Sequence, residues 1–287
     1  MSADPVPQPP PDLAALRSRT DRTLGSFLSG IREEMSSVAP DALLPIDEVI
    51  RLVEAGGKRL RPAFCYWGFR AAGGADGEPI QRASAALELL HAMALIHDDV
   101  MDRSPERRGV AASVPFLAGE ARRRGSSDPE HAGVSLALLA GDLAAVLADR
   151  LFLSSGFAPD RLVPALDRYH RMRTDMALGQ CLDLVAEGGD ETTASLKGGS
   201  YTVQGPLVIG ATLAGGNPDV MAALGAYGAS LGLAFQLLDD ERDGEAATEP
   251  GRVAALVSQA RAALDGIGFD HAATAALRTL ADMVGSG

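Results

Sequence analysis

The stretch that decides the fold is Leu87–Asp102, which reads LELLHAMALIHDDVMD. Its apolar residues recur at helical spacing over more than three turns, which predicts a buried α-helix. The helix ends in an acidic cluster, in which Asp98 and Asp102 are four residues apart and share one face. Like charges at this spacing destabilise a bare helix, so we expect a bound cation between them. Two carboxylates that leave other coordination positions of the metal open suit Mg2+, which retains bound waters and accepts phosphate oxygens as ligands.

A second stretch, Leu231–Asp243 (LGLAFQLLDDERD), repeats this design. Asp239 and Asp243 stand four residues apart after an apolar segment, and Gln236 lies three residues before Asp239, near the same face. One such acidic pair is a weak signal, because a solvated helix end gives the same pattern. Two clusters of one design are much less expected by chance. Facing each other across a bundle, they would make a site for several metal ions.

Helical periodicity also dominates the rest of the chain, and no convincing run of alternating β-branched residues predicts a strand. The predicted helices span Leu13–Met35, Pro45–Ala55, Arg59–Ala72, Ser84–Asp102, Gly133–Leu153, Arg161–Leu184, Ser195–Ala214, Met221–Arg242, Arg252–Leu264 and His271–Val284. Residues 1–12 are polar and Pro-rich, which favours a disordered tail. The sequence therefore predicts an all-α, single-domain bundle over residues 13–287, with a central cavity.

The composition excludes several classes of protein. A net charge of −12 argues against nucleic acid as the main partner. Two cysteines in 287 residues do not make a disulfide framework, and the N-terminus lacks the basic and apolar regions of a signal peptide. The most apolar run, Val134–Ala148, is interrupted by Asp142, so we expect no transmembrane segment. These features predict a cytoplasmic protein.

Lysine is used at only two places, because 24 of the 26 basic residues are arginines. Lys58 lies in the turn Gly56–Pro62 (GGKRLRP), whose glycines allow close backbone approach and whose cations suit phosphate. Lys197 opens a predicted helix. Both are candidates for sites that need a compact ammonium rather than a planar guanidinium. Codon bias is the alternative explanation.

Six motifs occur along the chain in a fixed order: GGKRLRP, HAMALIHDDVMDRSPERRG, GDLAAVLAD, GQCLDL, LKGGSYTVQGPL and FQLLDDERD. Together they resemble the trans-isoprenyl diphosphate synthases, which include geranylgeranyl, farnesyl and longer-chain polyprenyl diphosphate synthases. The resemblance runs from about Arg17 to Asp243 and resumes weakly in the C-terminal helix. It implies a homodimeric, Mg2+-dependent prenyltransferase that joins isopentenyl diphosphate to an allylic diphosphate. The apolar Gly133–Leu153 segment could serve the dimer interface.

The resemblance also implies roles for single residues. Asp98 and Asp102 would bridge two Mg2+ ions on the allylic diphosphate, and Asp239, supported by Asp243, would hold a third. The allylic diphosphate would be contacted by Arg107 and Lys197. The diphosphate of isopentenyl diphosphate would be held by Lys58, Arg61, His91 and Arg108. The reacting centre would be lined by Gln180, Asp183, Thr202 and Gln236. For His91, a satisfied core position is the alternative.

Two residues are expected to set the product length. The growing chain must run along the helix that bears Asp98, so Ala94, one turn back, and Met93 meet it first. Bulky aromatics at these places stop growth early in the resembling family. Ala94 offers no block and Met93 a flexible, partial one, which predicts a product of about C20.

The sequence departs from the family pattern at two places. Gly198 follows Lys197 where the family usually has threonine. After Asp243 the family continues for several dozen residues, whereas Gly244–Pro250 here leads almost directly to a helix. Either a lid and a helix are lost or the sequence omits residues. Two further functions thus stay open: a non-catalytic subunit of a heteromeric synthase and, less favoured, a type I terpene cyclase. The retained aspartates argue against the first, and GGKRLRP and RRG against the second.

Overall fold

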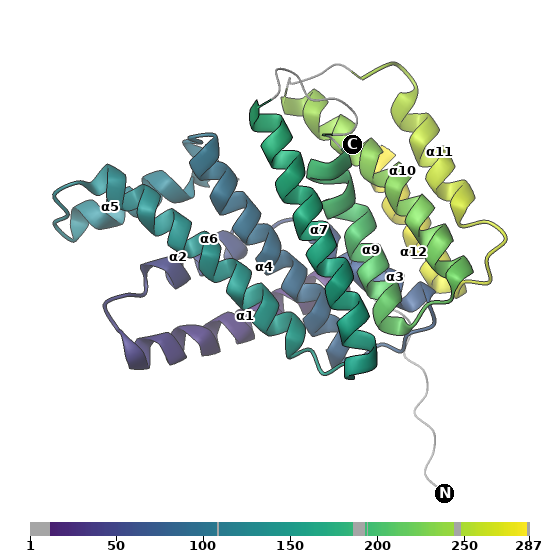
Figure 1. Cartoon of the computed structure of the whole chain (residues 1–287), viewed down its shortest axis with the longest axis horizontal. Helices are drawn as coiled ribbons and strands as arrows, with labels where there is room; N and C mark the ends of the chain where they lie inside the picture. The colour runs from purple at the N-terminus through teal and green to yellow at the C-terminus, as the bar shows by residue number, and fades with distance from the viewer. Residues whose placement is uncertain (1–11, 108, 186–192, 194, 244–247, 286–287) are drawn as a thin grey trace, which may run out of the picture. The chain divides into compact units, whose positions relative to one another are not determined.

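The computed structural model describes residues 12–107, 109–185, 193, 195–243 and 248–285, without the side chains of Ser195, Lys197 and Asp243. Helices make up most of this part of the chain, which confirms the predicted all-α class (Figure 1). By its contacts the chain divides into two compact units. The first unit comprises residues 19–62 and 77–158, and the second comprises residues 63–76 and 159–287 with the residues up to 18. The single domain predicted over residues 13–287 stays a prediction.

The first unit is built around two long helices, α4 and α6. Its elements are most of α1 (Leu13–Val38), α2 (Leu44–Glu54), α4 (Glu78–Met101), β1 (Glu106–Arg107), β2 (Val110–Ala111), α5 (Ser113–Arg123) and α6 (Pro129–Leu153). Helix α6 packs along α4 and also contacts α5 and α2 (Figure 1). Small residues allow the close approach of α6 to α5, since a Cβ added at Gly133 would lie only 2.8 Å from the Ala118 Cβ on α5.

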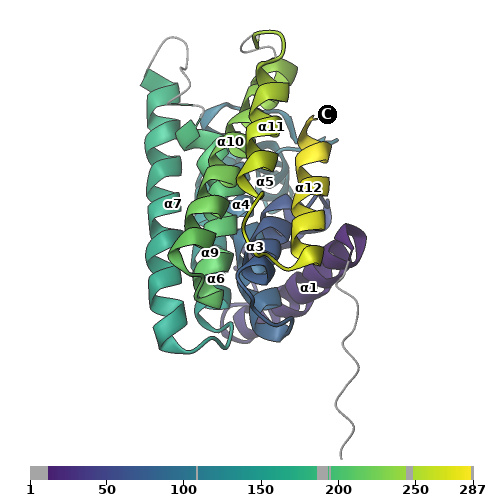
Figure 2. The ribbon, with the colours of Figure 1, turned by 90° about the vertical axis from the view of Figure 1, so that its right-hand side faces the viewer.

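The second unit is built around α10. Its elements are α3 (Leu60–Ala71), which begins in the first unit, α7 (Pro159–Val185), the π-helix η1 (Ser195–Gln204), α9 (Gly205–Ala214), α10 (Pro218–Asp243), α11 (Arg252–Ala263) and α12 (His271–Gly285). Helix α10 contacts η1, α9, α11 and α12, and Figure 2 shows α10, α11 and α12 running side by side. The buried Tyr227 hydroxyl on α10 donates to the Leu277 carbonyl on α12 at 2.7 Å. Burial raises the pKa of Tyr227 well above its ordinary value.

Several predicted boundaries differ from the structure. The predicted tail ended at residue 12, but Asp12 caps α1, because its Oδ1 accepts from the Ala15 N–H at 2.7 Å. Helix α5 and the short β1–β2 hairpin were not predicted. The segment predicted as one helix, Ser195–Ala214, is helical throughout, but it starts as the π-helix η1 and becomes an α-helix, α9, at Gly205. Pro206 explains the change, because a proline lacks the N–H that a continuing helix would use.

Helix α10 also bears on the membrane prediction. Among the described residues, it is the one helix that is long and apolar enough to cross a bilayer by length and composition alone. This is weak evidence for a span, because the core helix of a soluble protein passes the same test. In this structure 39% of its apolar window is buried, and the helix contacts four neighbouring helices of its unit.

Candidate functional site

The first acidic cluster lies at the C-terminal end of α4. The helix is fixed in the core of its unit, with Leu89, Leu90 and Ile96 fully buried. The Asp102 N–H donates to the Asp98 carbonyl at 2.8 Å, so helical geometry continues through the cluster. Asp98 is half-buried and Asp102 is exposed. The predicted spacing of the two outer carboxylates, one turn apart at the end of a rigid helix, is therefore present.

The middle aspartate of this cluster has a different role, which the sequence did not reveal. Asp99 is fully buried. Its Oδ1 accepts from Arg107 Nε at 2.8 Å, and its Oδ2 accepts from the Ser113 N–H at 3.0 Å. Asp99 therefore ties the end of α4 to the β1 strand and to the start of α5. An arginine bound through Nε keeps two further nitrogens that can donate to a phosphate.

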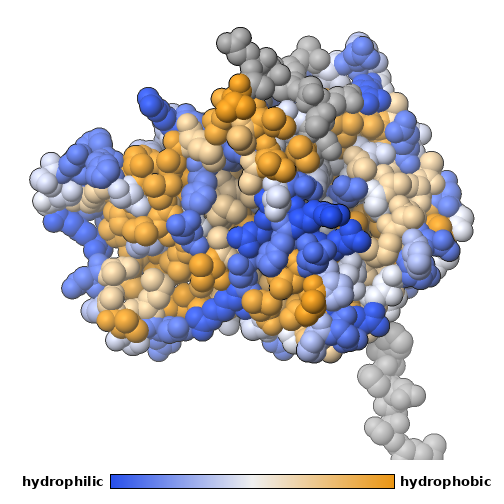
Figure 3. Space-filling view, in the orientation of Figure 1, coloured by the Kyte–Doolittle hydropathy of each residue, from blue (hydrophilic) through white to orange (hydrophobic). Residues whose placement is uncertain are grey.

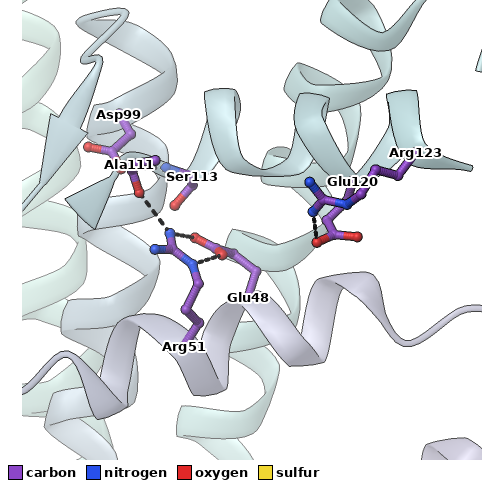
Figure 4. Close-up of polar contacts among 7 residues, drawn as sticks. All are labelled: Glu48, Arg51, Asp99, Ala111, Ser113, Glu120 and Arg123. Atoms are coloured by element: carbon purple, nitrogen blue, oxygen red, sulfur yellow. Dashed lines mark hydrogen bonds and ion pairs between the residues drawn. The ribbon is translucent and has the colours of Figure 1, made fainter.

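The hairpin that carries Arg107 is also held from α2 (Figure 4). Arg51 Nη2 donates to the Ala111 carbonyl on β2 at 3.0 Å, and its guanidinium stacks over the Phe116 ring at 4.2 Å. The fully buried Glu48 orients Arg51 through two hydrogen bonds, of 2.6 and 2.8 Å. Strands β1 and β2 are thus pinned by a buried carboxylate from α4 and, through Arg51, by another from α2.

Asp99→Asn is expected to destabilise the protein although it keeps the shape of the side chain. An asparagine offers one acceptor oxygen, so its NH2 group must face either the Arg107 Nε–H or the Ser113 N–H. A buried donor left unsatisfied costs about 1–3 kcal/mol. Thermal unfolding should therefore show a lower midpoint, whereas Asp102→Asn, which changes an exposed carboxylate, should leave it unchanged. Equal midpoints for Asp99→Asn and the parent would refute the anchoring role.

The basic turn before α3 is held by Arg59, for which the sequence predicted no role of its own. Arg59 is 5% exposed and has a φ of 52°, and Gly56 has a φ of 85°. Arg59 Nη1 donates to the buried Glu88 at 2.7 Å and its Nε to Asp21 at 2.8 Å. Burial alone would lower the pKa of Arg59, but these two carboxylates outweigh it and raise the pKa. The anchored turn leaves Lys58 exposed.

The second acidic cluster, at the end of α10, repeats the pattern of the first. The middle aspartate, Asp240, again binds a neighbour: its Oδ1 accepts from Gln236 Nε2 at 2.6 Å. Gln236 is 8% exposed and Asp239 is half-buried. The side chain of Asp243 lies outside the described part of the chain. In both clusters, therefore, the middle carboxylate is engaged by a residue of its own unit.

The π-helix η1 brings further predicted residues to α10. Thr202 is 1% exposed and lies on η1, as does Lys197, whose side chain is outside the description. π-Helices are rare in proteins, and those that occur are often found at functional sites. Gln180 and Asp183, both half-buried, lie near the end of α7, which also contacts η1.

The predicted site residues therefore fall into two sets. The first unit contains Asp98, Asp102, Arg107, Lys58, Arg61 and His91, together with Met93 and Ala94 on α4; Arg108 lies outside the described residues. The second unit contains Gln180, Asp183, Thr202, Gln236 and Asp239, with the backbones of Lys197 and Asp243. His91 and Arg61 are half-buried. The roles given to these residues stay predictions.

The donors present fit Mg2+ better than a metal that needs a closed protein cage. Among the described residues, no group of three or more His, Cys, Asp and Glu side chains is placed to hold a metal ion. Mg2+ is commonly bound by one or two carboxylates and completed by substrate phosphates and water. Paired aspartates at the end of a helix, with cations nearby for the phosphates, are such an incomplete site.

These features indicate a class: an all-helical protein whose paired aspartates and nearby cations suit Mg2+ and phosphate ligands. Comparisons with known proteins agree. A family profile described as polyprenyl synthetase matches residues 46–251. The chain belongs to the polyprenyl synthetase family, as the resemblance of its motifs indicated.

Individual relatives are also similar. A short chain isoprenyl diphosphate synthase of Methanothermobacter thermautotrophicus is 34% identical, over 74% of this chain and 62% of that protein. A geranylgeranyl diphosphate synthase of Methanosarcina mazei is 34% identical, over 77% and 68% respectively. This chain therefore spans about two thirds of these relatives. The solved geranylgeranyl pyrophosphate synthase of Corynebacterium glutamicum, complexed with isoprenyl diphosphate and magnesium, has a TM-score of 0.87 at 28% identity, over 96% of this chain and 99% of that chain.

Proposed function

We propose that this protein is a chain-elongating prenyltransferase that condenses isopentenyl diphosphate with an allylic diphosphate, head to tail and with trans geometry. One observation carries the proposal. Each unit has an apolar helix that ends in aspartates four residues apart, with the middle aspartate engaged by Arg107 in one unit and by Gln236 in the other. The outer aspartates of both clusters stand one helical turn apart, and Mg2+ with a diphosphate is a ligand that suits such a pair.

Bound Mg2+, for which we propose three ions, would stabilise the negative charge on the diphosphate that leaves the allylic carbon. Asp98 with Asp102, and Asp239 with Asp243, would hold these ions. The cations Arg107 and Lys197 would donate hydrogen bonds to the oxygens of the leaving diphosphate.

The reaction then proceeds on the substrates. The allylic C–O bond breaks, its electron pair stays with the diphosphate, and an allylic carbocation remains. The double bond of isopentenyl diphosphate attacks the cation and forms the new C–C bond. The proton lost from the adduct goes to the released diphosphate. Gln180, Asp183, Thr202 and Gln236 would line this centre, where exclusion of water protects the cation.

The second substrate would be held by a separate basic set, namely Lys58, Arg61, His91 and Arg108. The described geometry of the basic turn supports this for Lys58. The guanidinium of Arg59 donates hydrogen bonds to Glu88 and Asp21, whereas the neighbouring Lys58 is exposed. A compact ammonium on a turn fixed in this way can approach a phosphate group closely.

The product is proposed to be about C20 long, with Met93 as part of the wall that stops growth. Met93 lies on α4, 9% exposed, and the deeper Leu90 is fully buried. Met93→Phe should shorten the product and Met93→Ala should lengthen it, each by about one five-carbon unit, because the side-chain volume decides how much apolar chain can be buried. Chromatography of the dephosphorylated products checks this. If both variants release the parental length, Met93 does not set it.

A homodimer is proposed from the surface of α6. Leu138, Leu139 and Val146 are 46%, 56% and 61% exposed on a helix whose opposite residues form the core. Large exposed apolar patches mark interaction surfaces.

A cytoplasmic location is also proposed. The two cysteines, Cys65 and Cys181, are both free thiols, which fits a reducing compartment.

The shortened segment after Asp243 bears on the alternative functions. Residues 244–247 lie outside the described part, but Thr248 Oγ1 donates to the Leu237 carbonyl at 3.2 Å and α11 starts at Arg252. An ion pair from Arg261 to Asp282 joins α11 to α12, and Arg278 on α12 pairs with Asp265, two residues after the end of α11. The C-terminal helices are therefore packed on α10 despite the short connection.

One assay separates the proposed function from both alternatives. The purified protein is incubated with Mg2+, isopentenyl diphosphate and geranyl or farnesyl diphosphate. A chain-elongating enzyme gives a longer diphosphate only when isopentenyl diphosphate is present. A cyclase gives a hydrocarbon from the allylic substrate alone, and a non-catalytic subunit gives no product in either case. Either of the last two results would overturn the proposal.

A further inference from the structure

A row of three residues along α10 faces η1: Gly228, Gly232 and Gln236, each four positions after the last, and Asp240 follows one turn later. The first two bring the backbones into contact. A Cβ added at Gly228 would lie 2.7 Å from the Cα of Gln204, and one added at Gly232 would lie 2.3 Å from the carbonyl oxygen of Gly199. Because no side chain separates them, the position of η1 relative to α10 is fixed at this crossing.

The third residue of the row, Gln236, occupies the space of a missing side chain. A Cβ added at Gly198 would lie only 1.4 Å from Gln236 Oε1. The carboxamide is thus placed where the side chain of residue 198 would begin. Its other end is fixed by the hydrogen bond from Nε2 to Asp240 at 2.6 Å. Gly198 follows Lys197 directly, at the position where threonine is usual in the family.

We infer that Gly198 is a positioning residue for the Gln236 carboxamide, an inference that rests on the function proposed above. The Gln236 oxygen stands in for the hydroxyl that a threonine would supply beside Lys197. The exchange of threonine for glycine is then a substitution of one polar oxygen for another, and not a loss of catalytic equipment. Through Nε2, the same carboxamide orients Asp240 next to the metal-binding Asp239.

Restoring the family's threonine at residue 198 is expected to lower the activity of this protein. Any side chain at residue 198 forces Gln236 out of its place, because two atoms cannot lie 1.4 Å apart without a bond. Asp240 then loses its donor, and the carboxamide loses its place beside η1. Gly198→Thr and Gly198→Ala should each lower kcat about 10- to 100-fold with little change in KM.

A double-mutant cycle with Gln236→Ala tests the inference. If Gly198→Ala acts by displacing Gln236, it should cost less than about two-fold in kcat once Gln236 is already alanine, because coupled residues are not additive. Effects on kcat that multiply in the double variant would overturn the positioning role. Gly225→Ala, on α10 with no atom within 4 Å of the added Cβ, is the matched control and should keep the parental kcat.

A thermal-unfolding cycle on the same variants, without substrate, separates this inference from the proposed function. Gly198→Ala should lower the midpoint when Gln236 is present and raise it in the Gln236→Ala background, where the methyl group fills vacated space. Additive midpoints would overturn the contact. A parent without turnover would overturn the proposed function, and the positioning role with it, while coupled midpoints would still establish the contact. If Gly198→Ala alone does not fold, a folded double variant supports the inference and an unfolded one overturns it.

Discussion

Asp98→Ala and Asp239→Ala are each expected to lower kcat by at least roughly 10³-fold while leaving the helical fold intact. Each removes a carboxylate that would hold Mg2+ against the departing diphosphate, and several kcal/mol of charge stabilisation correspond to this factor. Both aspartates are half-buried at helix ends and fill no core volume, so circular dichroism should show the parental helix content. Steady-state kinetics with saturating Mg2+ measure the effect.

Asp167→Ala is the control for this pair. It removes an exposed carboxylate on α7, and both activity and stability should stay at the parental level. Undiminished turnover in either Asp98→Ala or Asp239→Ala would contradict the role of that cluster in binding metal. A large fall in the unfolding midpoint would instead give the aspartate a structural role, as we expect for Asp99.

Arg59→Lys is expected to cause the largest loss of stability of any conservative change considered for this protein. The guanidinium reaches Glu88, Asp21 and the Val53 carbonyl at 2.7, 2.8 and 2.6 Å, in three directions that a single ammonium cannot match. Breaking a buried ion pair costs about 3–5 kcal/mol, because the remaining charge, here that of Glu88, stays buried. The unfolding midpoint should fall by roughly 6–20 °C.

The reciprocal change one residue earlier is a matched comparison. Lys58→Arg keeps the charge at an exposed position, so the unfolding midpoint should not change. It should raise KM for isopentenyl diphosphate, because a planar guanidinium does not fit a site shaped for an ammonium. An unchanged KM and kcat would mean that the sparing use of lysine reflects codon bias. A parental midpoint for Arg59→Lys would show that the buried ion pairs do not anchor the turn.

The helical architecture could be predicted because apolar periodicity reports directly on which helix face is buried. Errors in the predicted helices arose at prolines, aspartates and glycines, because these residues occur in loops and also within or at the start of helices. The helix predicted from Gly133 starts four residues earlier, at Pro129, because Asp128 caps α6 by accepting from the His131 N–H and Pro129 fits its first turn. Helix α5 was missed because Pro115 and Gly119 weaken its signal, although its packing on α6 outweighs propensity.

The outer aspartates could be found from their spacing, but the division of labour within each cluster could not. Asp98 and Asp99 are adjacent and chemically identical, and only the fold decides that Asp99 is buried against Arg107 and Ser113. Arg59 was overlooked for the same reason, since its partners Asp21 and Glu88 lie 38 and 29 residues away in sequence. Long-range partners leave no local pattern, so only the structure reveals them.

The central claim is that each of the two aspartate clusters binds Mg2+ together with the allylic diphosphate, and a count of bound metal ions tests it most directly. The protein is titrated with Mn2+ in the presence of an unreactive thiolodiphosphate analogue of the allylic substrate, and free Mn2+ is followed by electron paramagnetic resonance. The account predicts three ions for the parent, about one for Asp98→Ala and two for Asp239→Ala, with binding that depends on the analogue. Equal counts in all three proteins, or Mn2+ binding that ignores the analogue, would contradict it.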